Sequence, residues 1–164
     1  MVDKLNQDIR PVVFIGLNGY DLPYTRVRCY HFAQQLNQLG MATEVLTYRD
    51  HLAPQRIGKL LDLRDSEKLP LIAKAIRRLQ KLHPRMLYVQ KAHYHAAAPY
   101  LLYRWFNQPY ILDYDDWDFD RSPFFNRKWL NDLVFKHKEN LEVSYQLIRD
   151  AKAVIVSSHF LKDV

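Results

Sequence analysis

The sequence predicts an α/β fold, in which an open and mostly parallel sheet carries helices on both faces. Three observations support this prediction. Short apolar segments of strand length recur along the chain, amphipathic segments of helical length separate them, and the first segment, 11–17 (PVVFIGL), is apolar almost throughout. Continuous apolar strands are typical of parallel sheets buried on both faces. The alternation is typical of right-handed strand–helix–strand crossovers.

Five segments are expected to form the strands of this sheet. They are 11–17, 43–48 (TEVLTY), 86–90 (MLYVQ), 110–113 (YILD) and 153–157 (AVIVS). β-Branched, aromatic and other apolar residues are frequent in them, as in other buried strands. The loop at 18–24, which contains a glycine and a proline, breaks the pattern after the first strand.

Helices are expected between these strands. The first has Thr25 as its N-cap, runs to about Leu39 and ends at Gly40. Its predicted inward positions are Val27, Tyr30, Phe32, Ala33 and Leu36, with the single cysteine, Cys29, on its buried face. Further helices are predicted at 69–82, at 94–106 and, as one long helix, at 126–149.

Length and composition are typical of one compact domain. The chain has 164 residues, of which 48% are hydrophobic and 26% charged, which excludes a disordered or fibrous protein. No run approaches the roughly 18 apolar residues that cross a bilayer, and residues 1–10 lack the apolar core of a signal peptide. A single cysteine fits a reducing compartment, so a cytoplasmic location is expected.

The positive charge leaves the partner open. A formal net charge of +6 favours an anionic partner, although ordinary surface lysines and arginines also account for it. A stripe of Lys74, Arg77, Arg78 and Lys81 lies at helical spacing, and either contacts anionic lipid headgroups or is a solvated face. No aromatic signature of RNA binding is present, so nucleic acid ranks lowest.

Polar residues follow the predicted strands, where ligands bind in open α/β sheets. After the first strand come Asn18, Gly19, Tyr20, Asp21, Tyr24, Arg26 and Arg28, and after the third come Gln90, Lys91, His93 and His95. After the fourth come Asp113, Asp115, Asp116, Trp117 and Asp118, and after the fifth come Ser157, Ser158 and His159. The distribution is typical of a site, although loops are polar in general.

Phosphate binding has one weak indication in the first loop. The chain contains no G-x-G-x-x-G or P-loop spacing, which argues against classical dinucleotide binding. Arg26 and Arg28 lie near the start of a predicted helix, whose amides and dipole favour an anion. The alternative is that both arginines are structural or surface residues.

The segment 113–120 (DYDDWDFD) carries five carboxylates in eight residues and has three interpretations. One carboxylate acts as a general base or orients an acceptor hydroxyl. Alternatively, the cluster holds Mg²⁺, Mn²⁺ or Ca²⁺, although the spacing excludes an EF-hand. The third is an acidic, solvated loop that caps the next helix. His93 and His95 lack the partners of a zinc site, and as a pair they are expected to line the cleft, with one of them contacting the substrate.

The order of these elements resembles the N-terminal half of family-4 glycosyltransferases of the GT-B fold. Residues 36–40 (LNQLG) and 43–46 (TEVL) match a Leu-x-x-x-Gly stretch followed by a strand, and 153–164 (AVIVSSHFLKDV) matches the segment that closes that half. The glycine pair usual in the first loop of the family is replaced by Tyr24, Thr25 and Arg26. Asp115-Asp116 stands where many members carry His-Asp.

The resemblance implies a Rossmann-like, acceptor-side domain spanning 1–164, with the nucleotide-sugar domain in a C-terminal part that this chain lacks. It implies transfer of a sugar with retention, from a nucleotide-sugar to a glycan, lipid-linked or small-molecule acceptor, with no cofactor and no metal. Gly19, Arg26 and Arg28 are then expected at the donor phosphates, and Asp115 or Asp116 at the reacting centre. The acceptor side is expected to comprise Tyr24, Lys91, His93, His95, Trp117, Ser157 and Ser158.

Two rival functions stay open. One is a GT-A-like transferase that uses Asp113, Asp115 and Asp116 as a metal-binding D-x-D. The other is a non-catalytic α/β module that binds an anionic surface, which would place the cytoplasmic protein at the membrane periphery. The resemblance also implies that these 164 residues have no turnover by themselves.

Overall fold

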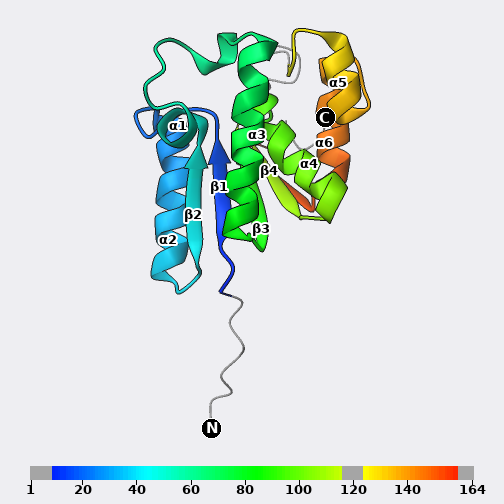
Figure 1. Cartoon of the computed structure of the whole chain (residues 1–164). Coiled ribbons are helices and arrows are strands. Elements are labelled where there is room, and N and C mark those ends of the chain that lie inside the picture. The colour runs from blue at the N-terminus through cyan, green and yellow to red at the C-terminus, as the bar shows by residue number, and fades with distance from the viewer. Residues whose placement is uncertain (1–8, 116–123, 159–164) are drawn as a thin grey trace.

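The structure, a computed structural model, describes residues 9–115 and 124–158, and they form an α/β fold built on five parallel strands. The strands are β1 (Val12–Gly16), β2 (Thr43–Thr47), β3 (Met86–Gln90), β4 (Tyr110–Tyr114) and β5 (Ala153–Val156). Their order in the sheet is β2-β1-β3-β4-β5 (Figure 1). The predicted strands are therefore confirmed, each to within one residue at either end.

Helices cover both faces of the sheet, as predicted. Alternate residues of β1 point to opposite faces: Val13 and Ile15 join the core under the later helices, whereas Phe14 packs with Cys29 and Ala33 of the first helix. The strand order explains this arrangement. The crossover from β1 to β2 and the crossovers toward β5 run in opposite directions, so right-handed connections place their helices on opposite faces. The sheet is Rossmann-like.

The first helix begins earlier than the sequence predicts. It is continuous from 23 to 38, through α1 (Pro23–Thr25), the π-helical η1 (Arg26–His31) and α2 (Phe32–Gln38), with Leu22 as N-cap. The prediction of Thr25 as N-cap was wrong, because proline at the first helical position starts the helix. Thr25 instead lies buried inside it, and its Oγ1 hydrogen-bonds Gln90 at 3.4 Å.

The predicted inward side of this helix is confirmed in part: Ala33 is buried, and Tyr30 and Leu36 pack against the same cluster. Val27 and Phe32, two of the predicted inward residues, are 45% and 42% exposed. Thr25 and Cys29 are buried, and Cys29 lies on the sheet side as expected. A π turn holds more residues than an α turn, so a pattern read at 3.6 residues per turn drifts out of phase.

The helix α3 (Asp65–Leu82) starts four residues before the predicted range, because its first turn is fixed by side chains. Glu67 accepts a hydrogen bond from the backbone N–H of Arg64 at 2.8 Å. The carboxylate of Asp65 accepts the backbone N–H groups of Asn126 and Arg127 at 2.8 and 2.9 Å. This contact ties the start of α3 to a segment sixty residues later.

The predicted long helix at 126–149 is two helices, α5 (Lys128–Phe135) and α6 (Asn140–Asp150). Lys136 ends α5 in the left-handed region at φ 66°. The buried Asn131 side chain then accepts the N–H of Phe125 at 3.0 Å and donates to the carbonyl of Lys138 at 3.2 Å. A side chain that bonds the flanking backbone competes with helical hydrogen bonds, which divides the segment.

The remaining connections contain short helical turns. A π turn, η2 (Tyr48–Leu52), and a 3₁₀ turn, η3 (Leu60–Asp62), occupy the irregular stretch before α3. The segment after β3 forms η4 (Tyr94–Ala96) and α4 (Ala97–Phe106), which together match the predicted helix at 94–106. Among the described residues, no helix has the length and apolar character needed to cross a membrane.

Candidate functional site

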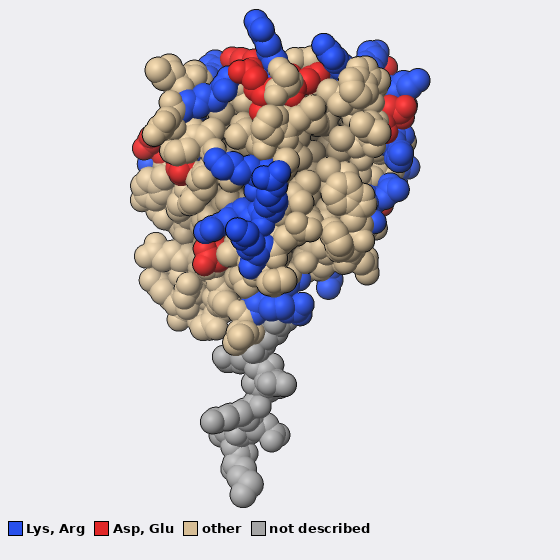
Figure 2. Space-filling view, viewed as in Figure 1, with Lys and Arg blue, Asp and Glu red and all other residues tan. Residues whose placement is uncertain are grey.

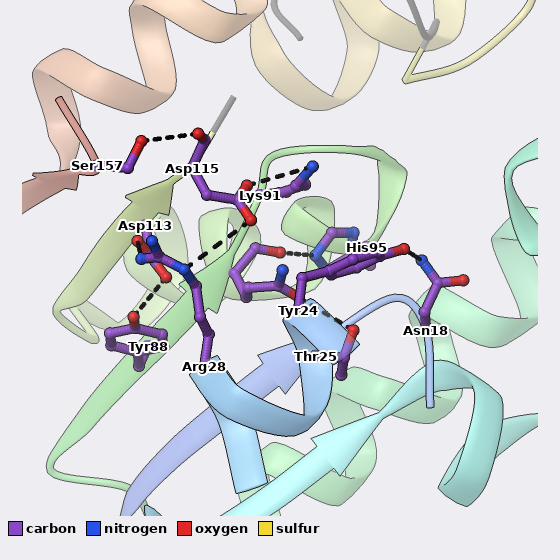
Figure 3. Close-up of polar contacts among 11 residues, drawn as sticks. Asn18, Tyr24, Thr25, Arg28, Tyr88, Lys91, His95, Asp113, Asp115 and Ser157 are labelled. Carbon is purple, nitrogen blue, oxygen red and sulfur yellow. Dashed lines mark hydrogen bonds and ion pairs between the residues drawn. The ribbon is translucent and has the colours of Figure 1, made fainter. Parts of the chain in front are cut away.

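The polar residues predicted to meet at the carboxyl edge of the sheet do so at the ends of β1, β3 and β4. A chain of contacts runs from Tyr88 through Asp113, Arg28, Asp115 and Lys91 to Tyr24 and Asn18 (Figure 3). The residues come from three strand ends and from the first helix. The edge is therefore the candidate site.

Asp113 holds this series of contacts from inside the sheet. Its side chain is fully buried and accepts hydrogen bonds from Arg28 Nη1 and from the hydroxyl of Tyr88, both at 2.6 Å. Burial, and then the bond to Asp113, raises the pKa of Tyr88, so the phenol is a neutral donor. Both carboxylate oxygens of Asp113 are occupied. This residue orients Arg28.

Asp115 extends this series of contacts toward the surface. Its carboxylate lies 3.2 Å from Lys91 Nζ and 3.9 Å from Arg28 Nε. The Ser157 hydroxyl donates to the backbone carbonyl of Asp115 at 2.7 Å, which joins the ends of β4 and β5. Two cations from different elements thus converge on one carboxylate that remains 15% exposed.

Lys91 reaches Asp115 from an uncommon backbone conformation. Its φ is 58°, in the left-handed region that long side chains rarely adopt. The backbone N–H of Lys91 donates to the carbonyl of Asp113 at 2.9 Å, and its ammonium lies 5.0 Å from the centre of the Tyr24 ring. Such conformations persist where the surroundings enforce them, and they are frequent at functional sites.

A small cavity of about 70 Å³ lies beside these charges. Its lining comprises Leu17, Asn18, Tyr24, Leu61, Gln90, Lys91 and His93. Asn18 Nδ2 donates to the Tyr24 hydroxyl at 2.5 Å. Gln90 is only 2% exposed, and its Nε2 has no hydrogen-bond partner within the part of the chain that the structure describes. A buried donor without a partner is costly.

The structure separates the two arginines that were expected at the donor phosphates. Arg28 turns toward Asp113, whereas the Arg26 guanidinium lies over the ring of Tyr20, 5.6 Å from its centre. Residues two apart on a helix point to nearly opposite sides. Arg26 and Arg28 therefore do not form one anion site.

Gly19, the third residue expected there, faces a carboxylate. A Cβ at Gly19 would lie 2.0 Å from Asp50 Oδ1, and Asp50 Oδ2 accepts the backbone N–H of Tyr20 at 2.8 Å. The same oxygen accepts the hydroxyl of Tyr30. The predicted contact between Gly19 and a phosphate has no support in this arrangement, because Asp50 already occupies the adjoining loop amide.

The two histidines have different places. His93 lines the cavity and is 6% exposed, in agreement with the prediction. His95 is fully buried, its Nε2 lies 3.1 Å from the carbonyl of Gln90, and its ring packs edge-on against Tyr48. The prediction that His95 lines the cleft was wrong, because η4 turns its ring into the core.

The buried His95 makes stability depend on pH. Burial, followed by the neighbouring His93, lowers the pKa of His95 from 6.5 to about 3. The unfolded chain then binds a proton that the folded chain excludes. We expect the free energy of unfolding to be unaffected by this group above pH 6.5. Between pH 6.5 and 3 it should fall by up to about 1.4 kcal/mol per pH unit. Urea unfolding at several pH values measures it, and His95→Gln should flatten the slope in that window; an unchanged slope would contradict the assignment.

Several predicted residues lie elsewhere or outside the described part. Asp116 and Trp117 fall within 116–123, and His159 within 159–164, which are outside the described residues. Ser157 and Ser158 follow β5 and are both exposed, as expected for residues at the cleft rim. Sequence reasoning missed Tyr88 and Thr25, since a strand tyrosine and an apparent helix cap carry no signal of a role in the site.

The metal-binding alternative gains no support from the described residues. Among them, no group of three histidine, cysteine, aspartate or glutamate side chains has the arrangement of a metal site. In that alternative Asp113 is a ligand, yet both of its oxygens are bonded to Arg28 and Tyr88. A cation at Asp113 would therefore share these oxygens with Arg28 and Tyr88.

Comparison with known proteins leaves the class of the protein open. No family model and no curated protein sequence matches the chain. Among solved structures, the chain is similar to a conserved protein from Enterococcus faecalis V583, with 14% identity over 93% of this chain and 96% of that one, at a TM-score of 0.43. The fold assignment consequently stands on the strand order and the parallel pairing described above.

Proposed function

We propose that this chain is the acceptor-side domain of a glycosyltransferase that moves a sugar from a nucleotide-sugar to an acceptor hydroxyl. The observation that carries the proposal is the carboxylate of Asp115, held by Lys91 and Arg28 at the carboxyl edge of a parallel sheet beside a polar cavity. The resemblance in the order of motifs along the sequence supports the same class of reaction.

The cavity has the chemistry of a site for hydroxyl groups. Asn18 and Gln90 carry neutral amide groups that donate and accept, and Tyr24 adds an aromatic wall. Paired amide and aromatic side chains of this kind orient small polar ligands without a net charge. At about 70 Å³ the cavity admits part of an acceptor, such as one hydroxyl-bearing edge, and leaves the rest of the acceptor above it.

The proposed reaction assigns distinct tasks to the two carboxylates at the end of β4. The acceptor oxygen forms a bond to the anomeric carbon, and the bond from that carbon to the phosphate oxygen breaks. The nucleoside diphosphate leaves with the electron pair, and the acceptor proton passes to it or to a nearby carboxylate. Asp115, or the following Asp116, orients the acceptor and the reacting sugar, while Asp113 positions Arg28.

The nucleotide is held in this proposal by a second domain, as in the family that the sequence resembles. The test therefore uses the full-length natural protein that contains these residues. Consumption of a panel of UDP- and GDP-sugars is measured with and without EDTA, alone and with candidate acceptors. Consumption of one donor that persists in EDTA supports the proposal and identifies the sugar.

Two other outcomes discriminate the rivals. Consumption that EDTA abolishes, and that Mn²⁺ restores, indicates the metal-dependent alternative at 113–116. Failure to consume any donor, together with unchanged chemical shifts of Asn18 and Gln90 when donors and acceptors are added, overturns the proposal.

A further inference from the structure

The helix α3 exposes a line of cations along one face. Lys74, Arg77, Arg78 and Lys81 are all exposed, and their spacing of three and four residues places them on one side of the helix. No acidic residue occurs between Lys68 and Leu82. Figure 2 shows Lys and Arg side chains gathered in a column over this helix.

Within the described residues, these cations have no carboxylate partners. Lys74 donates to the backbone carbonyl of Leu52 at 2.9 Å, which is not a charge. Across residues 9–115 and 124–158, none of the four side chains forms an ion pair with a carboxylate. Their charge therefore faces solvent uncompensated, unlike that of Arg56 and Lys128, which are paired with Glu67 and Glu139.

Tertiary packing brings exposed aromatic side chains to the carboxyl end of this line. Trp105 and Phe106, at the end of α4, are 60% and 62% exposed, and their rings meet edge-on. Phe106 lines a depression of about 320 Å³ together with Leu79 and His83 from the end of α3. Packing within the fold does not bury these two rings. Exposed apolar patches of this kind often mark a surface that contacts a partner or a membrane.

We propose that the basic–aromatic face, formed by Lys74, Arg77, Arg78, Lys81, Trp105 and Phe106, binds an anionic lipid bilayer. Each lysine or arginine near an anionic membrane contributes attraction. Tryptophan and other amphipathic or apolar rings insert at the boundary between headgroups and acyl chains. The four cations lie along one side of α3 and the two rings lie beside its carboxyl end, whereas surfaces for single-stranded nucleic acid combine a basic groove with rings on which successive bases stack.

The experiment is cosedimentation of the full-length protein with vesicles of phosphatidylcholine alone or with 30 mol% phosphatidylglycerol. Binding is expected to the anionic vesicles and to weaken as salt rises. Changing Lys74, Arg77, Arg78 and Lys81 together to Gln should lower the apparent affinity at least about ten-fold. A matched control changes four exposed cations outside α3, Lys136, Lys138, Arg149 and Lys152, and should lower it much less.

A second variant tests the aromatic part without altering charge. Trp105→Ala with Phe106→Ala should weaken binding to the same vesicles by about three-fold or more and reduce the blue shift of tryptophan fluorescence. Circular dichroism melting confirms that each variant is folded.

Three results would overturn the proposal. They are equal binding to neutral vesicles, an equal loss in the control variant, or binding of RNA in place of vesicles. Because none of these six residues belongs to the candidate site, the result is independent of whether sugar transfer is found.

Discussion

Replacing Arg28 with Met is expected to destabilise the folded chain by about 3–5 kcal/mol. Arg28 is the cation that faces the carboxylate of Asp113, which is fully buried and also accepts the Tyr88 hydroxyl. Methionine preserves most of the side-chain volume but removes the charge. The carboxylate is then left buried without compensation, which costs far more than the lost contact itself.

The measurement is urea unfolding of the wild type and the variant, with the midpoint and slope compared. A double variant, Arg28→Met with Asp113→Asn, is the informative control because asparagine keeps an acceptor for Tyr88 and removes the stranded charge. It should recover most of the lost stability. Arg26→Met should change stability by less than about 0.5 kcal/mol, since Arg26 lies over the ring of the exposed Tyr20. A loss of less than about 1 kcal/mol for Arg28→Met would show that Asp113 is not held as described.

Replacing Asp115 with Asn in the full-length protein is expected to lower kcat by about 10²–10⁴-fold if sugar transfer is established. The substitution keeps the size of the side chain and leaves a neutral amide oxygen beside Lys91. It removes the negative charge that the proposed reaction uses to orient the acceptor hydroxyl and to stabilise positive charge on the sugar ring. KM for the donor should change little.

The comparison with Asp116→Asn shows which carboxylate carries the larger part of the effect. Ser157→Ala is the structural control, since its hydroxyl donates to the backbone carbonyl of Asp115 and its loss should reduce kcat by less than about five-fold. An equal fall for Ser157→Ala and Asp115→Asn would indicate a positioning effect of the strand end. Unchanged turnover in Asp115→Asn would remove the residue from the mechanism.

Sequence patterns located the edge of the sheet where the candidate site lies but not the partners within it. Asn18, Gln90, Lys91 and Asp115 follow predicted strands, and parallel strands bring their carboxyl ends to one edge. The pairing of Arg28 with Asp113 was not predictable, because the two are eighty-five residues apart and nothing local relates them. The position of Trp105 and Phe106 beside α3 was not predictable either, because the two helices are separate in sequence.

The errors in the helices have local causes that a periodicity analysis overlooks. A π turn at Arg26–His31 left Val27 and Phe32 exposed in the first helix, and a left-handed residue, Lys136, divided the last one. Both depend on backbone conformations that are stabilised by contacts with other elements, such as the hydrogen bond between Thr25 and Gln90.

What the sequence by itself determined is the α/β class, the five strands to within a residue at each end, and the edge at which polar residues collect. These follow from hydrophobic burial, which depends on short-range patterns of apolar residues. Only the tertiary structure decided that Asp50 faces Gly19, that His95 lies in the core, and which cations meet Asp115. Those outcomes depend on distances between side chains that are remote in sequence, and packing alone fixes such distances.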